Sequence, residues 1–211
     1  MTTTHGDEAR MAVAGLILAG GRARRMGGQD KGLVPLAGRP MVEHVLDRIR
    51  PQVDDVVISA NRNRDVYARY RHRVLADIVG HYSGPLAGML SALIAVEQPW
   101  LAVVPCDSPL LPNDLVARLL ASVCAESADI AVAHDGQRLQ PVVALLNRSL
   151  ATSLRSYLEG GGRKIDTWYL QHRIAITDLS DHPEAFLNIN TLKEHAVLEQ
   201  KVLSRHAGTT D

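Results

Sequence analysis

The sequence predicts a three-layer α/β/α sandwich, in which helices cover both faces of a mostly parallel sheet. Two observations predict this fold class. Apolar runs of strand length recur along the 211 residues, and they alternate with longer segments whose apolar residues are spaced as on one face of a helix. The apolar runs are also continuous rather than alternating, which is typical of strands buried on both faces. Strands that alternate with helices favour parallel pairing through crossover connections.

The predicted elements can be placed individually along the chain. Six segments have the composition of buried strands: 12–19, 55–60, 73–77, 100–107, 129–135 and 140–147. Three segments have helical spacing and a proline suited to a first helical turn: 40–50, 85–97 and 111–125. A further helix is expected after Asn147, and a final helix is expected from Thr191.

Length and composition limit what the chain can be. We expect one domain over 11–204, with flexible ends at 1–10 and 205–211. A net charge of zero and an aromatic content of 4% argue against nucleic-acid binding. No apolar run reaches the roughly 20 residues that cross a bilayer, and no secretory signal is evident. Two isolated cysteines argue against a disulfide framework or a zinc site, and Cys106 is expected to be a buried structural thiol. A cytoplasmic protein is predicted.

The ends of the predicted strands indicate where a ligand would bind. In open α/β sheets, ligands bind outside the carboxyl ends of the strands. Four parts of the sequence occupy such positions: the loop after Ala19, the segment 59–61, Asp77, and the segment 106–109. They are far apart in the sequence, and we expect them to converge in space.

The loop after the first strand combines glycines with basic side chains. Gly20 and Gly21 would let main-chain N–H groups approach an anion closely. The basic residues, which suit phosphate oxygens, are Arg22, Arg24, Arg25 and Lys31. The loop matches neither a P-loop nor the G-x-G-x-x-G fingerprint, and an N-K-x-D motif is also lacking, so a GTP-dependent switch is disfavoured. A solvated loop is the alternative, but the position at a strand's carboxyl end favours an anion site.

Four blocks of the sequence together resemble the molybdenum cofactor guanylyltransferases. They are "LAGGRARRMGGQDKGLVPLAGRP" (18–40), "SGPLAGM" (83–89), "VPCDSP" (104–109) and "NINT" (188–191). The resemblance implies a Rossmann-like fold of the nucleotide-diphospho-sugar transferase type. It also implies transfer of GMP from GTP to molybdopterin, with Mg²⁺ as cofactor and pyrophosphate as the leaving group. The alternative is a sister nucleotidyltransferase that uses CTP, or one with a sugar-phosphate acceptor.

The resemblance also implies roles for individual residues. The catalytic residues would be Arg25, Lys31 and Asp107, with Asp107 as the metal ligand. The residues that bind GTP would be Leu18, Ala19, Gly20, Gly21, Lys31, Asp77 and Asp107. Asp77 is assigned to guanine or to ribose, because a carboxylate can accept from both N1–H and the 2-amino group of guanine. Some relatives carry Asn where Ser59 stands, so either Ser59 or Asn61 is a further candidate contact.

A second group of residues is assigned to molybdopterin. Arg163, in the stretch "GGGRK" (160–164), would bind the pterin phosphate together with Asn188 and Asn190. The alternatives are a simple connector with a surface arginine and, for the asparagines, the first turn of a helix. Molybdenum-insertion proteins and molybdoenzymes that accept the cofactor are plausible partners, whereas nucleic acid and membrane are not expected.

Overall fold

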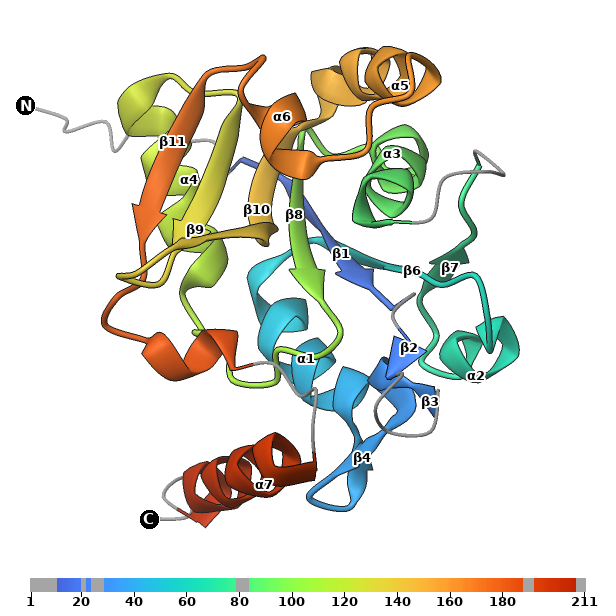
Figure 1. The fold of residues 1–211 in the computed structure, drawn as a ribbon, viewed down its shortest axis with the longest axis vertical. Coiled ribbons are helices and arrows are strands. Elements are labelled where there is room, and N and C mark those ends of the chain that lie inside the picture. Colours follow the sequence, from blue (N-terminus) through green and yellow to red (C-terminus); the bar gives the residue numbers. More distant parts are fainter. Residues whose placement is uncertain (1–10, 20–21, 24–28, 79–83, 188–191, 208–211) are drawn as a thin grey trace, which may run out of the picture.

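A seven-stranded sheet forms the middle layer of the molecule (Figure 1). The computed structural model describes residues 11–19, 22–23, 29–78, 84–187 and 192–207. Within these residues, the strands follow the spatial order β11-β9-β10-β8-β1-β6-β7. Their bounds are β1 Val13–Leu18, β6 Asp55–Ser59, β7 Arg73–Leu75, β8 Trp100–Pro105, β9 Ile130–His134, β10 Leu139–Asn147 and β11 Ile174–Asp178. All neighbours are parallel except β10, which runs antiparallel to both β8 and β9.

The central strand β1 sets the geometry of the site. It pairs in parallel with β6 on one side and with β8 on the other. Its last residue, Leu18, is in register with Ser59 and with Pro105. The segments that follow these three strands therefore leave the sheet at the same edge, as the sequence predicts. We call this the carboxyl edge.

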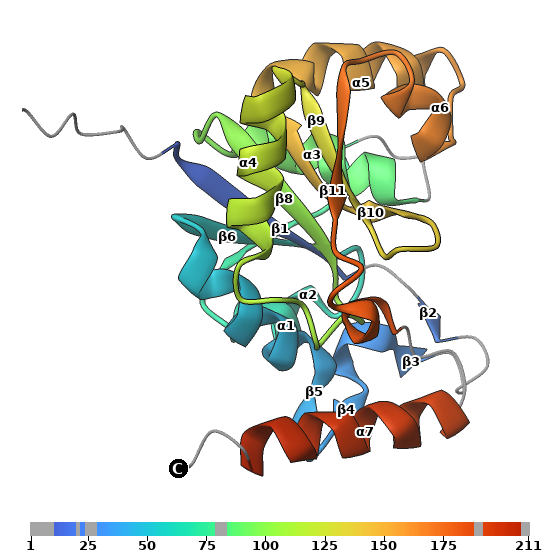
Figure 2. The ribbon, with the colours of Figure 1, turned by 90° about the vertical axis from the view of Figure 1, so that its left-hand side faces the viewer.

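Helices cover the two faces of the sheet (Figure 2). One face packs against α1 (Met41–Ile49), α2 (Arg64–Ala68) and α4 (Leu115–Glu126). The other face packs against α3 (Pro85–Ala95), α5 (Ala151–Glu159) and α6 (Ile165–Tyr169). The three-layer sandwich predicted from the sequence is confirmed. None of the helices in the described part of the chain combines the length and hydrophobicity that crossing a membrane requires.

Short 3-10 segments and hairpins complete the described fold. The 3-10 segments are η2 Lys31–Leu33, η3 Arg50–Gln52, η4 Arg148–Leu150 and η5 Pro183–Phe186. Two short hairpins are formed by β2 (Arg22–Ala23) with β3 (Gln29–Asp30) and by β4 (Pro35–Leu36) with β5 (Arg39–Pro40).

The last helix, α7 (Leu192–Ala207), lies against the β4–β5 hairpin (Figure 2). Its buried residues Leu198 and Val202 belong to the same apolar cluster as Leu36. Glu199 accepts a hydrogen bond at 2.8 Å from the amide of Ala37 at the hairpin turn. The predicted final helix is therefore confirmed, and it continues to Ala207, inside the segment 205–211 for which the sequence predicts flexibility.

Three features differ from the expectations. The strand β11 is not predicted, because its residues alternate between buried and exposed instead of forming a continuous apolar run. It is an edge strand that pairs only with β9, and Ile176 on it is exposed. The short helices α2 and α6 are also not predicted. Finally, α4 begins at Leu115 rather than at Pro112, and Asp114 is its N-cap residue.

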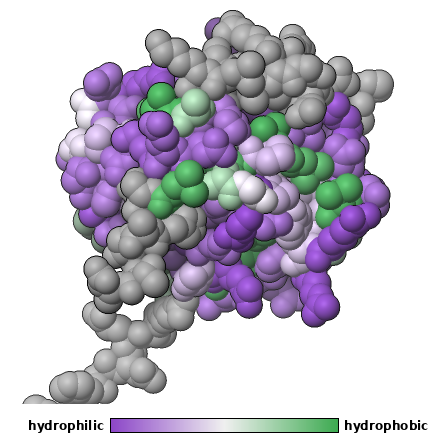
Figure 3. All heavy atoms as spheres, turned by 90° about the horizontal axis from the view of Figure 1, so that it is seen from below, coloured by the Kyte–Doolittle hydropathy of each residue, from purple (hydrophilic) through white to green (hydrophobic). Residues whose placement is uncertain are grey.

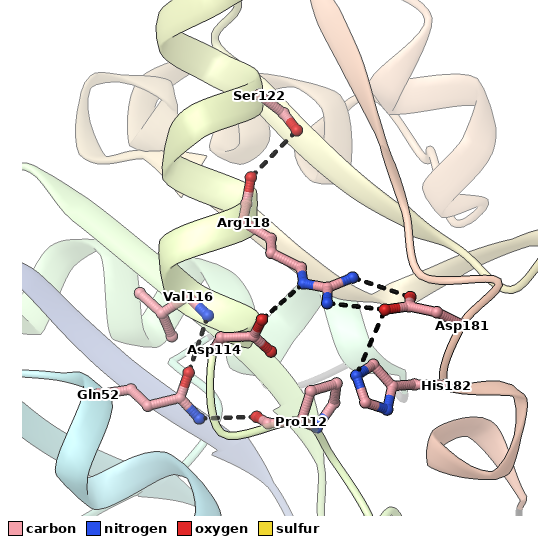
Figure 4. A network of polar contacts seen from close by, with 8 residues as sticks. All are labelled: Gln52, Pro112, Asp114, Val116, Arg118, Ser122, Asp181 and His182. Atoms are coloured by element: carbon pink, nitrogen blue, oxygen red, sulfur yellow. Dashed lines mark hydrogen bonds and ion pairs between the residues drawn. The ribbon is translucent and has the colours of Figure 1, made fainter.

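A polar network fixes the connection between β8 and α4 (Figure 4). The Arg118 guanidinium donates to both oxygens of Asp181, at 2.8 and 2.7 Å, and to Asp114 at 2.8 Å. Gln52 donates to the Pro112 carbonyl at 2.9 Å and accepts from the Val116 amide at 2.9 Å. The start of α4 is thus tied to η3 and to the chain after β11, which steadies the loop that carries Asp107.

Gly88 in α3 is required by close packing against the carboxyl edge. A Cβ atom there would lie 2.6 Å from Ser59 Oγ and 2.8 Å from Leu18 Cδ2. We expect Gly88→Ala to lower the free energy of unfolding by about 1–3 kcal/mol, measured by urea denaturation, because overpacking outweighs the better helix propensity of alanine. The double variant Ser59→Ala/Gly88→Ala should recover part of the loss. A more stable Gly88→Ala protein would contradict the close contact.

Candidate active site at the carboxyl edge of the sheet

Lys31 and Asp107, 76 residues apart in the sequence, meet at the carboxyl edge. Lys31 Nζ donates to Asp107 Oδ2 at 3.0 Å. The two side chains are largely shielded from solvent, with exposed fractions of 20% and 12%. A partly buried ion pair is less screened by water and salt than a surface pair, so its charges act strongly on any ligand bound beside it. The convergence predicted from the sequence is therefore present, while the roles of the two residues stay predictions.

Main-chain pairing beyond the strands positions Asp107. The Cys106 amide donates to the Leu18 carbonyl at 3.1 Å, and the Ala19 amide donates to the Ser59 carbonyl at 2.8 Å. These bonds extend β8 and β1 by one residue each, so Asp107 is the first residue of its segment past the pairing. The Ala19 amide is consequently engaged in the sheet, and a main-chain contact of Ala19 to GTP would use its carbonyl. Cys106 is buried as predicted, and burial raises the pKa of its thiol.

The buried carboxylate of Asp30 fixes the backbone next to Lys31. Asp30 precedes Lys31 and caps η2, with its Oδ1 accepting from the Gly32 amide at 3.3 Å. The same oxygen accepts from the Tyr67 hydroxyl at 2.6 Å, and Oδ2 accepts from the Asn63 side chain at 3.1 Å. Burial, followed by the nearby Cys106 and Asp30, raises the pKa of Tyr67, so its hydroxyl stays a donor. Asp30 is not among the site residues predicted from the sequence, although an Asp directly before a Lys-Gly turn is a signal for it.

Gly32 leaves no room for a larger residue. A Cβ atom at this position would lie 2.5 Å from the Tyr67 hydroxyl oxygen and 3.3 Å from the Cys106 sulfur. The backbone after Lys31 therefore passes directly over Tyr67 and the end of β8. This close approach explains why glycine follows the lysine in the sequence.

Asp77 and Asn61 form a second polar pair at the same edge. The Asn61 side chain donates to Asp77 Oδ2 at 2.7 Å and accepts from the Asp77 amide at 3.0 Å. Burial raises the pKa of the Asp77 carboxyl, and the hydrogen bond from Asn61 opposes that rise. Ser59 is instead buried below α3, next to Gly88. Of the two candidates left open by the sequence, Asn61 is therefore the one that lies beside Asp77.

The remaining predicted residues divide into two groups. Arg163 lies in the connection between α5 and α6, where its guanidinium donates to the Leu158 carbonyl at 3.0 Å and to the Gly162 carbonyl. These bonds close its own loop, and its predicted contact with the pterin phosphate remains a prediction. The other residues lie outside the described part of the chain: Gly20, Gly21, Arg25, Asn188 and Asn190.

The described residues offer limited protein ligands for a metal. Among them, no three His, Cys, Asp or Glu side chains are grouped so that they could hold an ion. Asp107 presents a carboxylate at the edge without such a group around it. That donor set fits Mg²⁺ in nucleotide sites, which usually takes one or two carboxylates, substrate phosphates and water.

The surface around this end of the molecule is mainly hydrophilic, with small groups of hydrophobic residues between the polar ones (Figure 3). Acidic and basic side chains thus converge at the carboxyl ends of a mostly parallel sheet, where α/β proteins bind nucleotides. The fold and this arrangement of side chains are typical of α/β proteins that bind nucleotides.

The chain belongs to the MobA-like NTP transferase domain family, whose sequence model matches residues 15–174. It is 51% identical over 190 residues to the molybdenum cofactor guanylyltransferase of Shewanella pealeana, covering 90% of this chain and 95% of the relative. The corresponding protein of Shewanella halifaxensis is 50% identical over 190 residues, with the same coverage of 90% and 95%. The family resemblance inferred from the sequence is confirmed.

Solved structures share the fold at lower identity. Molybdopterin-guanine dinucleotide biosynthesis protein A from Archaeoglobus fulgidus superposes with a TM-score of 0.77 at 22% identity, covering 90% of this chain and 99% of that one. CMP:2-keto-3-deoxy-manno-octonic acid synthetase complexed with CTP gives a TM-score of 0.72 at 12% identity, with coverage of 92% and 99%. At these identities the similarity concerns the fold.

The hydroxyl of Tyr67 is expected to stabilise the site. Tyr67→Phe removes the donor to buried Asp30, so we expect the free energy of unfolding to fall by about 1–3 kcal/mol, measured by urea denaturation. Tyr70→Phe is the matched control, because its half-buried hydroxyl donates to Glu43 at a longer 3.3 Å. Equal losses in the two variants would contradict a special role for the bond to Asp30.

Proposed function

We propose that this protein transfers GMP from GTP to molybdopterin, forming molybdopterin guanine dinucleotide and releasing pyrophosphate. The observation that carries the proposal is the 3.0 Å contact between Lys31 and Asp107 at the carboxyl edge. Relatives named molybdenum cofactor guanylyltransferase, about half identical over nine tenths of the chain, support the choice of substrates. GTP and molybdopterin would meet in the cytoplasm, with molybdenum-insertion and acceptor proteins as further partners.

The reaction explains why cationic side chains are needed. A phosphate oxygen of molybdopterin attacks the α-phosphorus of GTP, and the bond from that phosphorus to the oxygen bridging to the β-phosphate breaks. Both reactants are anions, so the protein has to neutralise and align them. In this proposal, Lys31 and Arg25 bind the phosphates and stabilise the charge that develops on pyrophosphate. Main-chain groups of residues 18–21 hold the nucleotide.

Asp107 would hold Mg²⁺ together with phosphate oxygens of GTP. Its carboxylate belongs to the chemical type that Mg²⁺ prefers, and the lack of further grouped ligands in the described residues suits an ion that is shared with the substrate. When bound, Mg²⁺ supplies positive charge that orients the triphosphate. Lys31, hydrogen-bonded to the same carboxylate, holds the Asp107 side chain in place.

The Asp77–Asn61 pair would select guanine. The Asn61 side chain fixes Asp77 through two hydrogen bonds: it donates to the Asp77 carboxylate and accepts from the Asp77 main-chain amide. A carboxylate oxygen has two lone pairs, so Asp77 can still accept from N1–H and the 2-amino group of guanine. Cytosine presents no such pair of donors. Arg163, Asn188 and Asn190 are proposed to bind the phosphate of molybdopterin.

The purified protein should convert GTP and molybdenum-loaded molybdopterin to the guanine dinucleotide and pyrophosphate when Mg²⁺ is present. Asp107→Ala should abolish turnover and still unfold in one cooperative thermal transition, and Lys31→Ala should weaken GTP binding by about tenfold or more, since it loses charge-assisted bonds to phosphate. Product detection by mass spectrometry and titration calorimetry measure the two effects. Asp65→Ala, an exposed acidic residue of α2, is the control.

Two results would count against this assignment. A folded wild-type protein that yields neither product contradicts the proposed activity. Normal turnover by Asp107→Ala, or turnover that persists after complete removal of divalent ions with a chelator, contradicts the metal assignment while leaving the activity in place.

Base selection is expected to depend on Asp77. For the wild type, GTP should raise the unfolding temperature more than CTP does at equal concentration. Asp77→Asn replaces an acceptor by an amide that also donates, so GTP affinity should fall by about tenfold or more. Asn61→Ala should produce a smaller loss in the same direction. If Asp77→Asn keeps its preference for GTP over CTP, Asp77 binds the ribose rather than guanine.

A further inference from the structure

Arg62 contains a buried polar atom that lacks a hydrogen-bond partner. Of the buried side-chain nitrogens and oxygens in the described residues, its Nη2 is the one without an acceptor. Other arginines among the described residues, such as Arg118 and Arg173, donate to carboxylates. A shielded guanidinium N–H without an acceptor is unfavourable and requires an explanation, such as a ligand that is bound during function.

The position of Arg62 places it at the carboxyl edge. It lies between Asn61, which is hydrogen-bonded to Asp77, and Asn63, which donates to Asp30. The main chain at Arg62 is therefore held on both sides, through Asn61 by Asp77 and through Asn63 by Asp30. The backbone of Arg62 therefore lies at the same edge as the Lys31–Asp107 pair.

The nearby carboxylates do not use Arg62. Asp77 accepts a hydrogen bond from Asn61, and Asp30 accepts from Asn63 and Tyr67. Amide and hydroxyl groups, rather than the Arg62 guanidinium, therefore donate to these carboxylates. A cation kept apart from neighbouring acids can bind an anion from outside the chain. Phosphate is the anion that a guanidinium suits, because its N–H groups match two phosphate oxygens at once.

We propose that Arg62 binds a phosphate group of a substrate at the carboxyl edge. The identity of that substrate rests on the proposed function, which supplies two sources: the triphosphate of the nucleotide and the phosphate of the acceptor. The phosphate oxygens accept from the guanidinium, and the buried Nη2 gains the acceptor that it lacks. This would make Arg62 a binding residue in addition to those that the resemblance implies.

The test replaces the guanidinium with an apolar chain of similar reach. Arg62→Met is compared with wild type and with Arg64→Met, an exposed arginine of the neighbouring α2. Binding of GTP and of inorganic tripolyphosphate is measured by titration calorimetry. We expect Arg62→Met to weaken both by about tenfold or more, Arg62→Lys to restore part of the affinity, and Arg64→Met to stay within about twofold of wild type.

Two outcomes support the proposal, and they distinguish the two sources of the phosphate. Loss of GTP and tripolyphosphate affinity assigns Arg62 to the nucleotide. Unchanged affinity for both, with the KM for molybdopterin raised about tenfold and kcat retained, assigns it to the acceptor. Because tripolyphosphate binding needs no turnover, a wild type that binds it through Arg62 and forms no guanine dinucleotide contradicts the proposed activity alone.

Thermal unfolding without ligand separates binding from a structural role. Removing an unsatisfied N–H should leave Arg62→Met at least as stable as wild type. A markedly less stable variant with unchanged binding and KM overturns the proposal, because Arg62 would then act in packing. Unchanged binding and KM at equal stability overturns it too.

Discussion

The contact between Lys31 and Asp107 is the interaction on which the rest of the site depends. It joins the loop after β1 to the end of β8, and it exists because these strands are neighbours in register in the middle of the sheet. Both side chains are mostly shielded, so either charge alone would be poorly solvated. The pair therefore constrains where η2 can lie, and it gives the carboxyl edge one acidic and one basic group at a fixed separation.

The Lys31–Asp107 pair alone supplies too little positive charge to bind the ligands that are proposed for the site. Lys31 and Asp107 cancel one another as a unit, whereas a triphosphate and a second phosphate bring several negative charges. Further cations have to come from elsewhere at the edge, and the sequence places arginines in the loop between β1 and β3. Arg62, which follows β6, supplies a further cation. Its neighbours Asn61 and Asn63 are fixed by hydrogen bonds to Asp77 and Asp30.

The sequence predicts the strands whose residues form a continuous apolar run, and it misses the strand that has no such run. All six continuous apolar runs form strands, whereas β11, which alternates between buried and exposed residues, gives no such run. The antiparallel direction of β10 is also invisible, because a buried strand has the same composition in either direction. Lys31 and Asp107 could be placed at one edge, since strand ends in parallel sheets coincide. The contact between Asp30 and Tyr67 could not be predicted, because Tyr67 resembles a core residue until the fold brings the two together.

The segment from Asn61 to Tyr67 links the two halves of the site. Asn61 is bonded to Asp77, while Asn63 and Tyr67 are bonded to Asp30, the residue before Lys31. Asn63 has a positive φ of 49°, a left-handed conformation that asparagine tolerates better than most residues. This local turn lets the chain leave Asp77 and reach Asp30 within a few residues. The proposed base-binding and phosphate-binding groups therefore rest on one support, so a displacement of that support moves both, and their relative placement is built into the fold before any nucleotide binds.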